Sequence, residues 1–157
     1  NGIFGCLSIK DNTGISIYNK HLKAGFILDH PTINKIVDDS IKQLSIKTPS
    51  MQQHIENLSG GNQQKVIVSR WLANDPEILI MDEPTRGIDV GAKHEIYEIM
   101  EQLADQGKSI IMISSEMPEL LGMADRVYVM CNGKITGEID QKEDMTQEKV
   151  MSFATQF

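Results

Sequence analysis

The sequence predicts an α/β fold in which helices cover a layered sheet, and three short apolar runs are the main evidence. These runs, at residues 78–81, 110–113 and 127–130, alternate along the chain with helical patterns. Continuous apolar runs of this length are typical of strands that are buried on both faces of a sheet. Asn132-Gly133 is a favoured two-residue hairpin turn, so the third run is expected to turn back into a strand at residues 134–139. Strands and helices that alternate in this way predict a layered α/β domain.

Helices are indicated by apolar residues at helical spacing, together with start and stop signals. Pro31-Thr32 marks the start of the first helix, with Thr32 as the expected N-cap. Gly107 follows the third helix and is expected to end it as a C′ residue. Thr146 is expected to cap the last helix. The predicted helices span residues 33–44, 63–73, 96–103 and about 147–154.

Composition narrows the class of protein. The 157 residues include 40% hydrophobic and 24% charged residues, which is ordinary for a globular domain. The net charge of −7 argues against nucleic acid as a partner, because nucleic-acid-binding domains usually carry a basic patch. No apolar stretch approaches the length that crosses a bilayer. Cys6 and Cys131 have neither metal-site nor redox-pair spacing, so a cytosolic domain with reduced thiols is expected.

Two acidic residues follow the first apolar run, in the order Asp82-Glu83-Pro84. Ligands of open α/β sheets bind at the carboxyl ends of the strands, so these acids are expected to lie where a metal-bound phosphate would bind. Asp82 would hold Mg²⁺, which prefers carboxylate oxygen, and Glu83 would orient an attacking water. Taken alone, the same pair is better explained as the solvated start of a loop.

A glycine pair precedes the second predicted helix, in the run Leu58-Ser59-Gly60-Gly61-Asn62-Gln63-Gln64. The N-terminus of a helix offers backbone N–H groups and a positive dipole end, and glycines let a phosphate approach the backbone. Ser59 adds a hydroxyl donor. Taken alone, this run is equally well an ordinary Gly-Gly turn before a helix.

In this order and spacing, the two motifs resemble the signature and Walker B motifs of the ATP-binding-cassette (ABC) family, and Asp89 resembles its D-loop aspartate. The resemblance implies a partial P-loop-NTPase-like layered sheet with a small helical subdomain. Residues 1–57 would be the remainder of that subdomain, and residues 58–157 the signature helix and the C-terminal part of the ATPase core. The family's sheet order implies that the strand at 110–113 pairs with the strand at 78–81 and faces a gap on its other side.

Longer runs such as GNQQKVIVSRWL and LIMDEPTRGIDVGAK are similar to the C-terminal ATPase domain of monosaccharide importers, above all the galactose/methyl-galactoside and ribose types. This implies an energy-coupling ATPase of a carbohydrate importer, with ATP and Mg²⁺ as cofactors, peripheral at the cytoplasmic face of the cell membrane. The implied partners are the N-terminal ATPase domain of the same polypeptide, membrane permease subunits and, indirectly, a periplasmic or extracellular sugar-binding protein. No nucleic-acid partner is implied, and the chain does not identify the sugar.

The resemblance also implies roles for individual residues. Family members work as paired domains with two ATP molecules between them. Asp82 and Glu83 would serve one ATP, and the signature would serve the other, whose phosphate-binding loop belongs to the partner domain. The residues implied to contact nucleotide are Ser59, Gly60, Gly61, Gln63 and Asp89.

Two departures from the family pattern affect the expected activity. Ser115 stands where the family has its switch histidine, which implies a slow or degenerate hydrolytic site. The pattern G-x-x-x-x-G-K-[ST] does not occur, and Gly107-Lys108-Ser109 is expected to be only a helix end and turn. By comparison with the family, the A-loop, Walker A and Q-loop precede residue 1, so the 157 residues alone are expected to be inactive and to bind ATP weakly.

Two other classes of function stay open at this point. One is a soluble cassette ATPase of translation or DNA repair, against which the importer-like PTRGIDVGAK run and the acidic net charge speak. The other is a non-catalytic interaction module, and the 157 residues alone are also expected to self-associate. Nucleotide binding by the 157-residue polypeptide separates this module from an ATPase.

Overall fold

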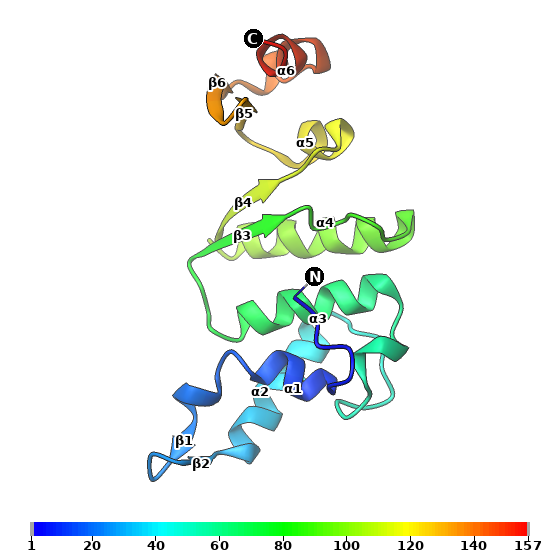
Figure 1. Ribbon diagram of the computed structural model, residues 1–157, viewed down its shortest axis with the longest axis vertical. Coiled ribbons are helices and arrows are strands. Elements are labelled where there is room, and N and C mark those ends of the chain that lie inside the picture. Colours follow the sequence, from blue (N-terminus) through cyan, green and yellow to red (C-terminus); the bar gives the residue numbers. More distant parts are fainter. Residues whose placement is uncertain (1, 157) are drawn as a thin grey trace. The chain divides into compact units, whose positions relative to one another are not determined.

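The computed structural model describes residues 2–156 and confirms the α/β class (Figure 1). It divides into two compact units, one up to Ile111 and one from Met112 onward, with the boundary inside strand β4. The predicted division after residue 57 remains a prediction. The first unit contains α1 (Ile9–Gly14), β1 (Leu22–Lys23), β2 (Ile27–Leu28), α2 (His30–Gln43), α3 (Gly60–Leu72), β3 (Ile78–Asp82), α4 (Val90–Asp105) and the start of β4 (Ser109–Ile113). The second contains the end of β4, α5 (Met117–Met123), β5 (Val127–Cys131), β6 (Lys134–Ile139) and α6 (Gln147–Ala154). Short 3₁₀ helices lie at Tyr18–Lys20, Ile55–Asn57 and Lys142–Asp144.

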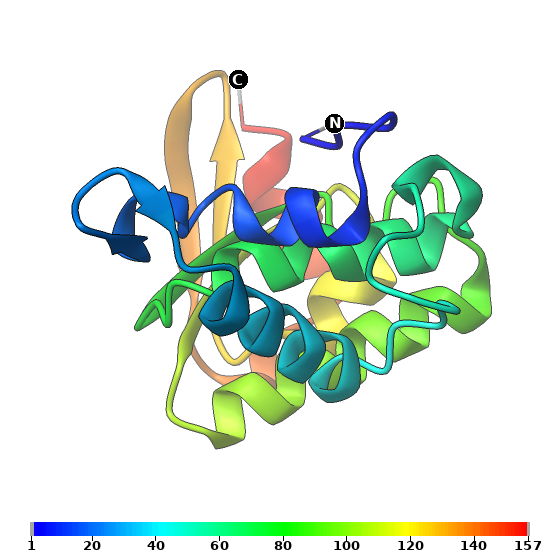
Figure 2. The ribbon, with the colours of Figure 1, turned by 90° about the horizontal axis from the view of Figure 1, so that it is seen from below.

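Helix α3 is the centre of the first unit, where α1, α2 and α4 all pack against it (Figure 2). Each of the four helices has fully buried apolar side chains, among them Ile9, Ile33, Val66 and Ile96. The amphipathic pattern predicted α2, α3 and α4, because such a stripe is stable only when it is covered. Helix α1 was not predicted. Helix α3 begins at Gly60, three residues before the predicted start, so both signature glycines are helical.

The start of α2 corrects one prediction. Asp29, and not Thr32, is the N-cap, and its carboxylate accepts a hydrogen bond from the Thr32 hydroxyl at 2.9 Å. Pro31 therefore lies inside the first turn of the helix. Proline is tolerated there because the first N–H groups of a helix have no intrahelical partner.

The predicted end of α4 is confirmed. Gln106 is the C-cap, and Gly107 follows with a φ of 85°, a left-handed conformation that favours glycine. Lys108 then turns back, and its Nζ lies 2.7 Å from Asp75 Oδ1 and 3.0 Å from the Pro76 carbonyl oxygen. Gly107-Lys108-Ser109 is therefore the connection between α4 and β4, as the sequence predicts.

Strands β3 and β4 pair in a two-stranded sheet, which confirms the predicted neighbours. The prediction that both faces of these strands are buried is wrong for the described residues. Leu79 is 7% exposed, but Ile78 is 58%, Ile80 66% and Ile111 51% exposed. Burial thus alternates along β3, because helices cover one face and nothing in residues 2–156 covers the other. An open apolar concavity of about 700 Å³, lined in part by Ile78, Ile80 and Trp71, lies on that side.

In the second unit, β5 and β6 form an antiparallel hairpin through Asn132-Gly133, as predicted. Both turn residues have positive φ angles, 51° and 76°, as a two-residue turn of type I′ requires. Helix α6, capped as predicted by Thr146, packs on this hairpin. A Cβ on Gly137 would lie only 2.2 Å from the Phe153 ring, so glycine is needed at this contact. The core consists of Val127, Val129, Ile139, Met145 and Val150.

We expect the 157-residue polypeptide to self-associate. Within residues 2–156 the β3–β4 sheet has no third strand, and an open strand edge beside exposed Ile78, Ile80 and Ile111 favours pairing with another copy. Light scattering on a dilution series is the measurement, and a mass above 17.6 kDa is expected. A stable monomer at every concentration would contradict this expectation.

Candidate functional site

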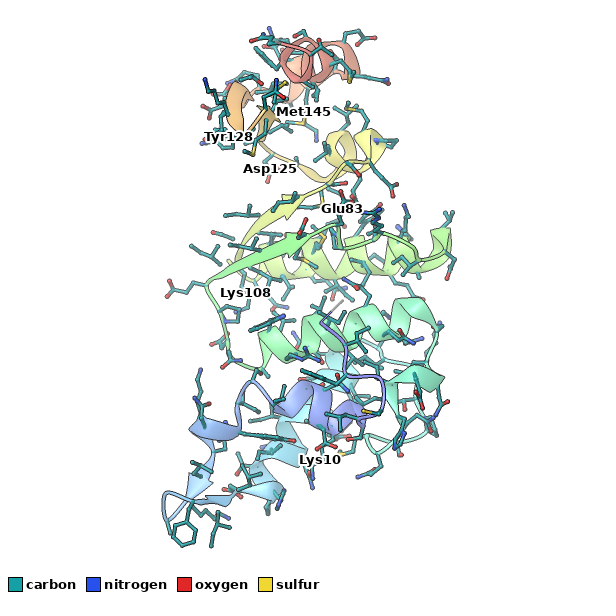
Figure 3. The ribbon with its side chains drawn as sticks, viewed as in Figure 1. Lys10, Glu83, Lys108, Asp125, Tyr128 and Met145 are labelled. Carbon is teal, nitrogen blue, oxygen red and sulfur yellow. The ribbon has the colours of Figure 1, made fainter. Side chains whose placement is uncertain are left out.

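The two predicted acidic residues lie at the carboxyl end of β3. Asp82 is the last residue of the strand, and Glu83 begins the following turn (Figure 3). Glu83 has a φ of 47°, and its carbonyl oxygen accepts a hydrogen bond from Arg86 N at 3.2 Å. A left-handed conformation is uncommon for a residue other than glycine and often marks a functional turn. The next two residues, Pro84 and Thr85, are buried. Their packing holds in place the turn that carries Glu83 and follows Asp82.

The signature serine and glycines lie at the N-terminus of α3. Ser59 is the N-cap, but its side chain accepts no capping bond from the helix backbone. The Ser59 carbonyl instead accepts the first helical bond, from Gln63 N at 2.9 Å. The first N–H groups of the helix lack intrahelical partners and carry the positive end of its dipole. Ser59 and Gly60 are both exposed, so this end of the helix can receive an anion.

Gly61 has a second role, which sequence reasoning missed. A Cβ built on Gly61 would lie 2.4 Å from Ala92 Cβ, so only glycine permits α3 to pack this closely on the start of α4. At Gly60 the nearest atom would be Ile88 Cγ2, at an ordinary 3.5 Å. Gly61 therefore brings the signature next to the loop that contains Asp89.

Asp89 caps α4. Its Oδ1 accepts a hydrogen bond from Ala92 N at 3.0 Å, and its backbone is extended, as is usual for an N-cap. The family resemblance implies that Asp89 contacts nucleotide, and that role remains a prediction. The capping bond shows that Asp89 also stabilises the start of the helix against which the signature packs.

Two amide side chains of the signature form hydrogen bonds with other residues of the same motif. Gln63 donates from Nε2 to the Leu58 carbonyl oxygen at 3.0 Å and so holds the residue before the signature serine. Asn62 donates from Nδ2 to Ser59 Oγ at 2.9 Å, while its Oδ1 accepts from Lys47 N at 2.8 Å. Asn62 was not among the predicted site residues. The available signal was a short amide side chain three residues after a serine N-cap.

An ion pair links the signature helix to α4. Lys65 is only 3% exposed, and its Nζ lies 2.8 Å from Glu95 Oε2 and 3.3 Å from the Ser45 carbonyl oxygen. Lys47 reaches the other oxygen of Glu95 at 3.3 Å. Hydrogen bonds from Lys65, and then from Lys47, hold the pKa of the Glu95 carboxyl below its ordinary value. The pair fixes α3 beside α4 one turn beyond the Gly61 contact.

Ser115 belongs to the second unit, whereas the signature, Asp82 and Glu83 belong to the first. Ser115 is exposed and precedes α5. Its neighbour Ser114 donates a short hydrogen bond to the buried Glu119 carboxylate and accepts one from Glu116 N at 3.0 Å. The Ser114 hydroxyl therefore joins the backbone just after Ser115 to the Glu119 side chain of α5.

The structure thus joins some of the predicted residues into one site and leaves others separate. Ser59, Gly60, Gly61 and Asp89 lie together where α3 meets α4. Asp82 and Glu83 form a second feature at the end of β3. Among residues 2–156, no helix is both long and apolar enough to cross a membrane.

With this geometry established, comparison with known proteins identifies the class. The family model for ABC transporters matches residues 3–86, which is more than half of the chain. The chain therefore belongs to the ABC transporter family, and the resemblance read from its motifs is confirmed.

Several curated relatives are similar over almost the whole of this chain. The galactose/methyl galactoside import ATP-binding protein MglA of Clostridium tetani is 55% identical over 99% of this chain and 31% of its own length. The arabinose import ATP-binding protein AraG of Paraburkholderia xenovorans is 53% identical over 98% of this chain and 30% of its own length. The ribose import ATP-binding protein RbsA of C. tetani is 49% identical over 99% and 31%. The chain thus spans about a third of the length of the curated relatives that it matches.

Solved structures show the same fold at lower identity. A nucleotide-free ATP-binding cassette from an ABC transporter matches 94% of this chain and 60% of its own length, with a TM-score of 0.79 and 23% identity. A dimeric post-hydrolysis cassette bound to ADP and Pi matches 87% of this chain and 58% of its own, with a TM-score of 0.73 and 22% identity. At this identity the likeness establishes the fold.

The Gly61 contact generates a prediction about stability. We expect Gly61→Ala to lower the free energy of unfolding by about 1–3 kcal/mol, because the added methyl overpacks the α3–α4 contact. Gly60→Ala is the matched control, and its stability should stay within about 0.5 kcal/mol of the parent because the added methyl meets only an ordinary contact. Denaturant titration followed by circular dichroism measures both. Equal stabilities would contradict the assigned packing role.

The Lys65–Glu95 pair generates a prediction about pH. Since the Glu95 pKa is lower in the folded state, its stabilisation is present above the ordinary value of 4.5 and is lost as the pH falls through the folded-state pKa. Glu95→Gln should therefore destabilise by about 1 kcal/mol at pH 7, a value that allows for partial exposure of the carboxylate. Unfolding curves between pH 7 and pH 3 should converge with those of the parent protein.

Glu101→Gln, at an exposed position of the same helix, is the control for this comparison. It should follow the parent at every pH. A difference for Glu95→Gln that persists unchanged at pH 3 would refute the ion-pair origin of the effect.

Proposed function

We propose that the chain is part of the C-terminal ATPase domain in the energy-coupling subunit of a monosaccharide importer. One observation carries the proposal, namely the exposed signature serine at the N-terminus of α3 in a chain that is 55% identical to a galactose/methyl galactoside import ATP-binding protein. The arabinose and ribose import relatives support the same class of substrate. These relatives favour an importer over a cassette ATPase of translation or DNA repair.

In this proposal the signature acts on an ATP whose phosphate-binding loop belongs to the N-terminal ATPase domain of the same polypeptide. The Ser59 hydroxyl and the N–H groups that begin α3 would donate to its terminal phosphate, and the helix dipole would favour the negative charge. Gln63, which holds the residue before Ser59, and Asp89, which caps α4, would lie next to this phosphate contact. The dimeric cassette among the structural relatives is a precedent for such pairing.

Asp82 and Glu83 would serve the second ATP. The donors fit Mg²⁺, because this ion is usually bound by one or two carboxylates together with phosphate oxygens, and Asp82 is an exposed carboxylate at the end of β3. Bound there, Mg²⁺ would neutralise charge on the phosphates. Glu83 would accept a hydrogen bond from the attacking water and orient it. Ser115 in place of a histidine would make hydrolysis at this site slow.

The wider assembly follows from the same proposal. The ATPase would sit at the cytoplasmic face of the membrane against permease subunits, and a sugar-binding protein on the other side would deliver the substrate. The identity of the sugar would be set by those other subunits.

Sugar uptake by the full-length transporter tests the proposal. Ser59→Arg should abolish uptake while expression and folding persist, because the side chain at this exposed N-cap would occupy the phosphate position without entering the core. Asn57→Arg, at an exposed residue just outside the signature, is the charge-matched control and should retain uptake. Normal uptake by Ser59→Arg at normal expression would refute the proposed role of the signature.

A further inference from the structure

The hydroxyl of Ser59 has an orientation that another side chain determines. A serine hydroxyl has one hydrogen to donate and two lone pairs to accept with. Ser59 Oγ accepts from Asn62 Nδ2 at 2.9 Å, and within residues 2–156 its side chain makes no other hydrogen bond. The lone pair that faces Asn62 is therefore occupied, so the hydroxyl hydrogen points elsewhere and remains available to donate.

The direction of the Asn62 amide follows from a backbone group. The N–H of Lys47 can only donate, so the Asn62 atom that lies 2.8 Å from it must be the oxygen, Oδ1. The amide nitrogen then has to face Ser59. The usual ambiguity between the oxygen and the nitrogen of an asparagine is thereby removed.

We infer that Asn62 is a positioning residue, which keeps the Ser59 hydroxyl hydrogen directed at a phosphate oxygen of the ATP held by the partner domain. This inference rests on the proposed function. The chain of bonds runs from Lys47 N to Asn62 and from Asn62 to Ser59, so the loop before α3 sets which way the signature serine donates. An acceptor at position 62 would reverse this polarity and turn the hydroxyl hydrogen inward.

A double-mutant cycle in the full-length ATP-binding protein, assembled with its permease, tests this inference. The variants are Asn62→Ala, Ser59→Ala and the double variant, and the readout is steady-state hydrolysis of MgATP, resolved into KM and kcat. Losing an oriented hydrogen bond to a charged group should reduce kcat/KM about tenfold or more in Ser59→Ala and by roughly fivefold in Asn62→Ala. The double variant should equal Ser59→Ala, because Asn62 acts only through that hydroxyl.

Asn62→Asp separates orientation from simple loss of a contact. The aspartate still accepts from Lys47 N but offers Ser59 a second acceptor, so kcat/KM should fall further than in Asn62→Ala. Part of that fall reflects the added charge near phosphate. The part of the fall in kcat/KM that disappears when Asn62→Asp is combined with Ser59→Ala measures the contribution of the hydroxyl. Asn57→Ala is the control for loss of an exposed asparagine beside the loop and should leave kcat/KM unchanged.

The remaining outcomes overturn the inference. If Asn62→Ala impairs hydrolysis equally with Ser59 present or replaced, Asn62 supports the loop at Lys47 and does not act through the serine. If Ser59→Ala is impaired and Asn62→Ala is normal, Asn62 has no positioning role, although the proposed function of the signature stands. If Ser59→Ala is itself normal, the proposed function of the signature fails and the inference fails with it.

Discussion

The close contact between Gly61 and Ala92 is the constraint on which the candidate site depends. Because residue 61 has no side chain, the first turn of α3 lies directly against the first turn of α4. That contact places Ser59 and Gly60 beside the loop that Asp89 ends, although about thirty residues separate them in the sequence. The Lys65–Glu95 pair then holds the two helices together one turn further on. The two glycines therefore differ, because Gly60 is exposed whereas Gly61 packs against Ala92.

The charge arrangement around this contact suits an anion. The N-terminus of α3 is exposed, and its N-cap serine keeps its side-chain oxygen away from the helix backbone. An N-cap serine usually satisfies one of the first N–H groups of its helix. At Ser59 that stabilisation is absent, and the hydroxyl and the first backbone N–H groups of the helix remain available as donors. Local helix stability is thus given up at the position where the proposed function needs hydrogen-bond donors.

Local signals predicted the parts of the fold that depend on local chemistry. The Asn132-Gly133 turn, the Thr146 cap and the end of α4 at Gly107 were all predicted, because each depends on the conformations open to one or two residues. The start of α2 was misplaced because a proline can lie either just before the N-cap of a helix or within its first turn, and Pro31 does the second. The burial of β3 was misjudged because an apolar run does not reveal whether a covering element lies within the same 157 residues.

The site shows the same division. The motifs predicted Ser59, Asp82 and Glu83 as site residues because their order and spacing are specific. The Gly61–Ala92 contact and the hydrogen bond from Lys47 N to Asn62 could not be predicted, because each joins segments that only tertiary packing brings together. The sequence therefore predicts which residues would carry the chemistry, and the structure shows which contacts hold them.

The central claim is that this signature faces an ATP bound by the other ATPase domain of the same polypeptide. Site-directed disulfide cross-linking tests it most directly, with Ser59→Cys paired to a cysteine in the phosphate-binding loop of the N-terminal domain and with Cys6 and Cys131 replaced by serine. We expect an intramolecular cross-link that forms efficiently with MgATP and poorly without nucleotide. Failure to form the cross-link with MgATP, in a protein that still transports sugar before the cysteines are introduced, would contradict it.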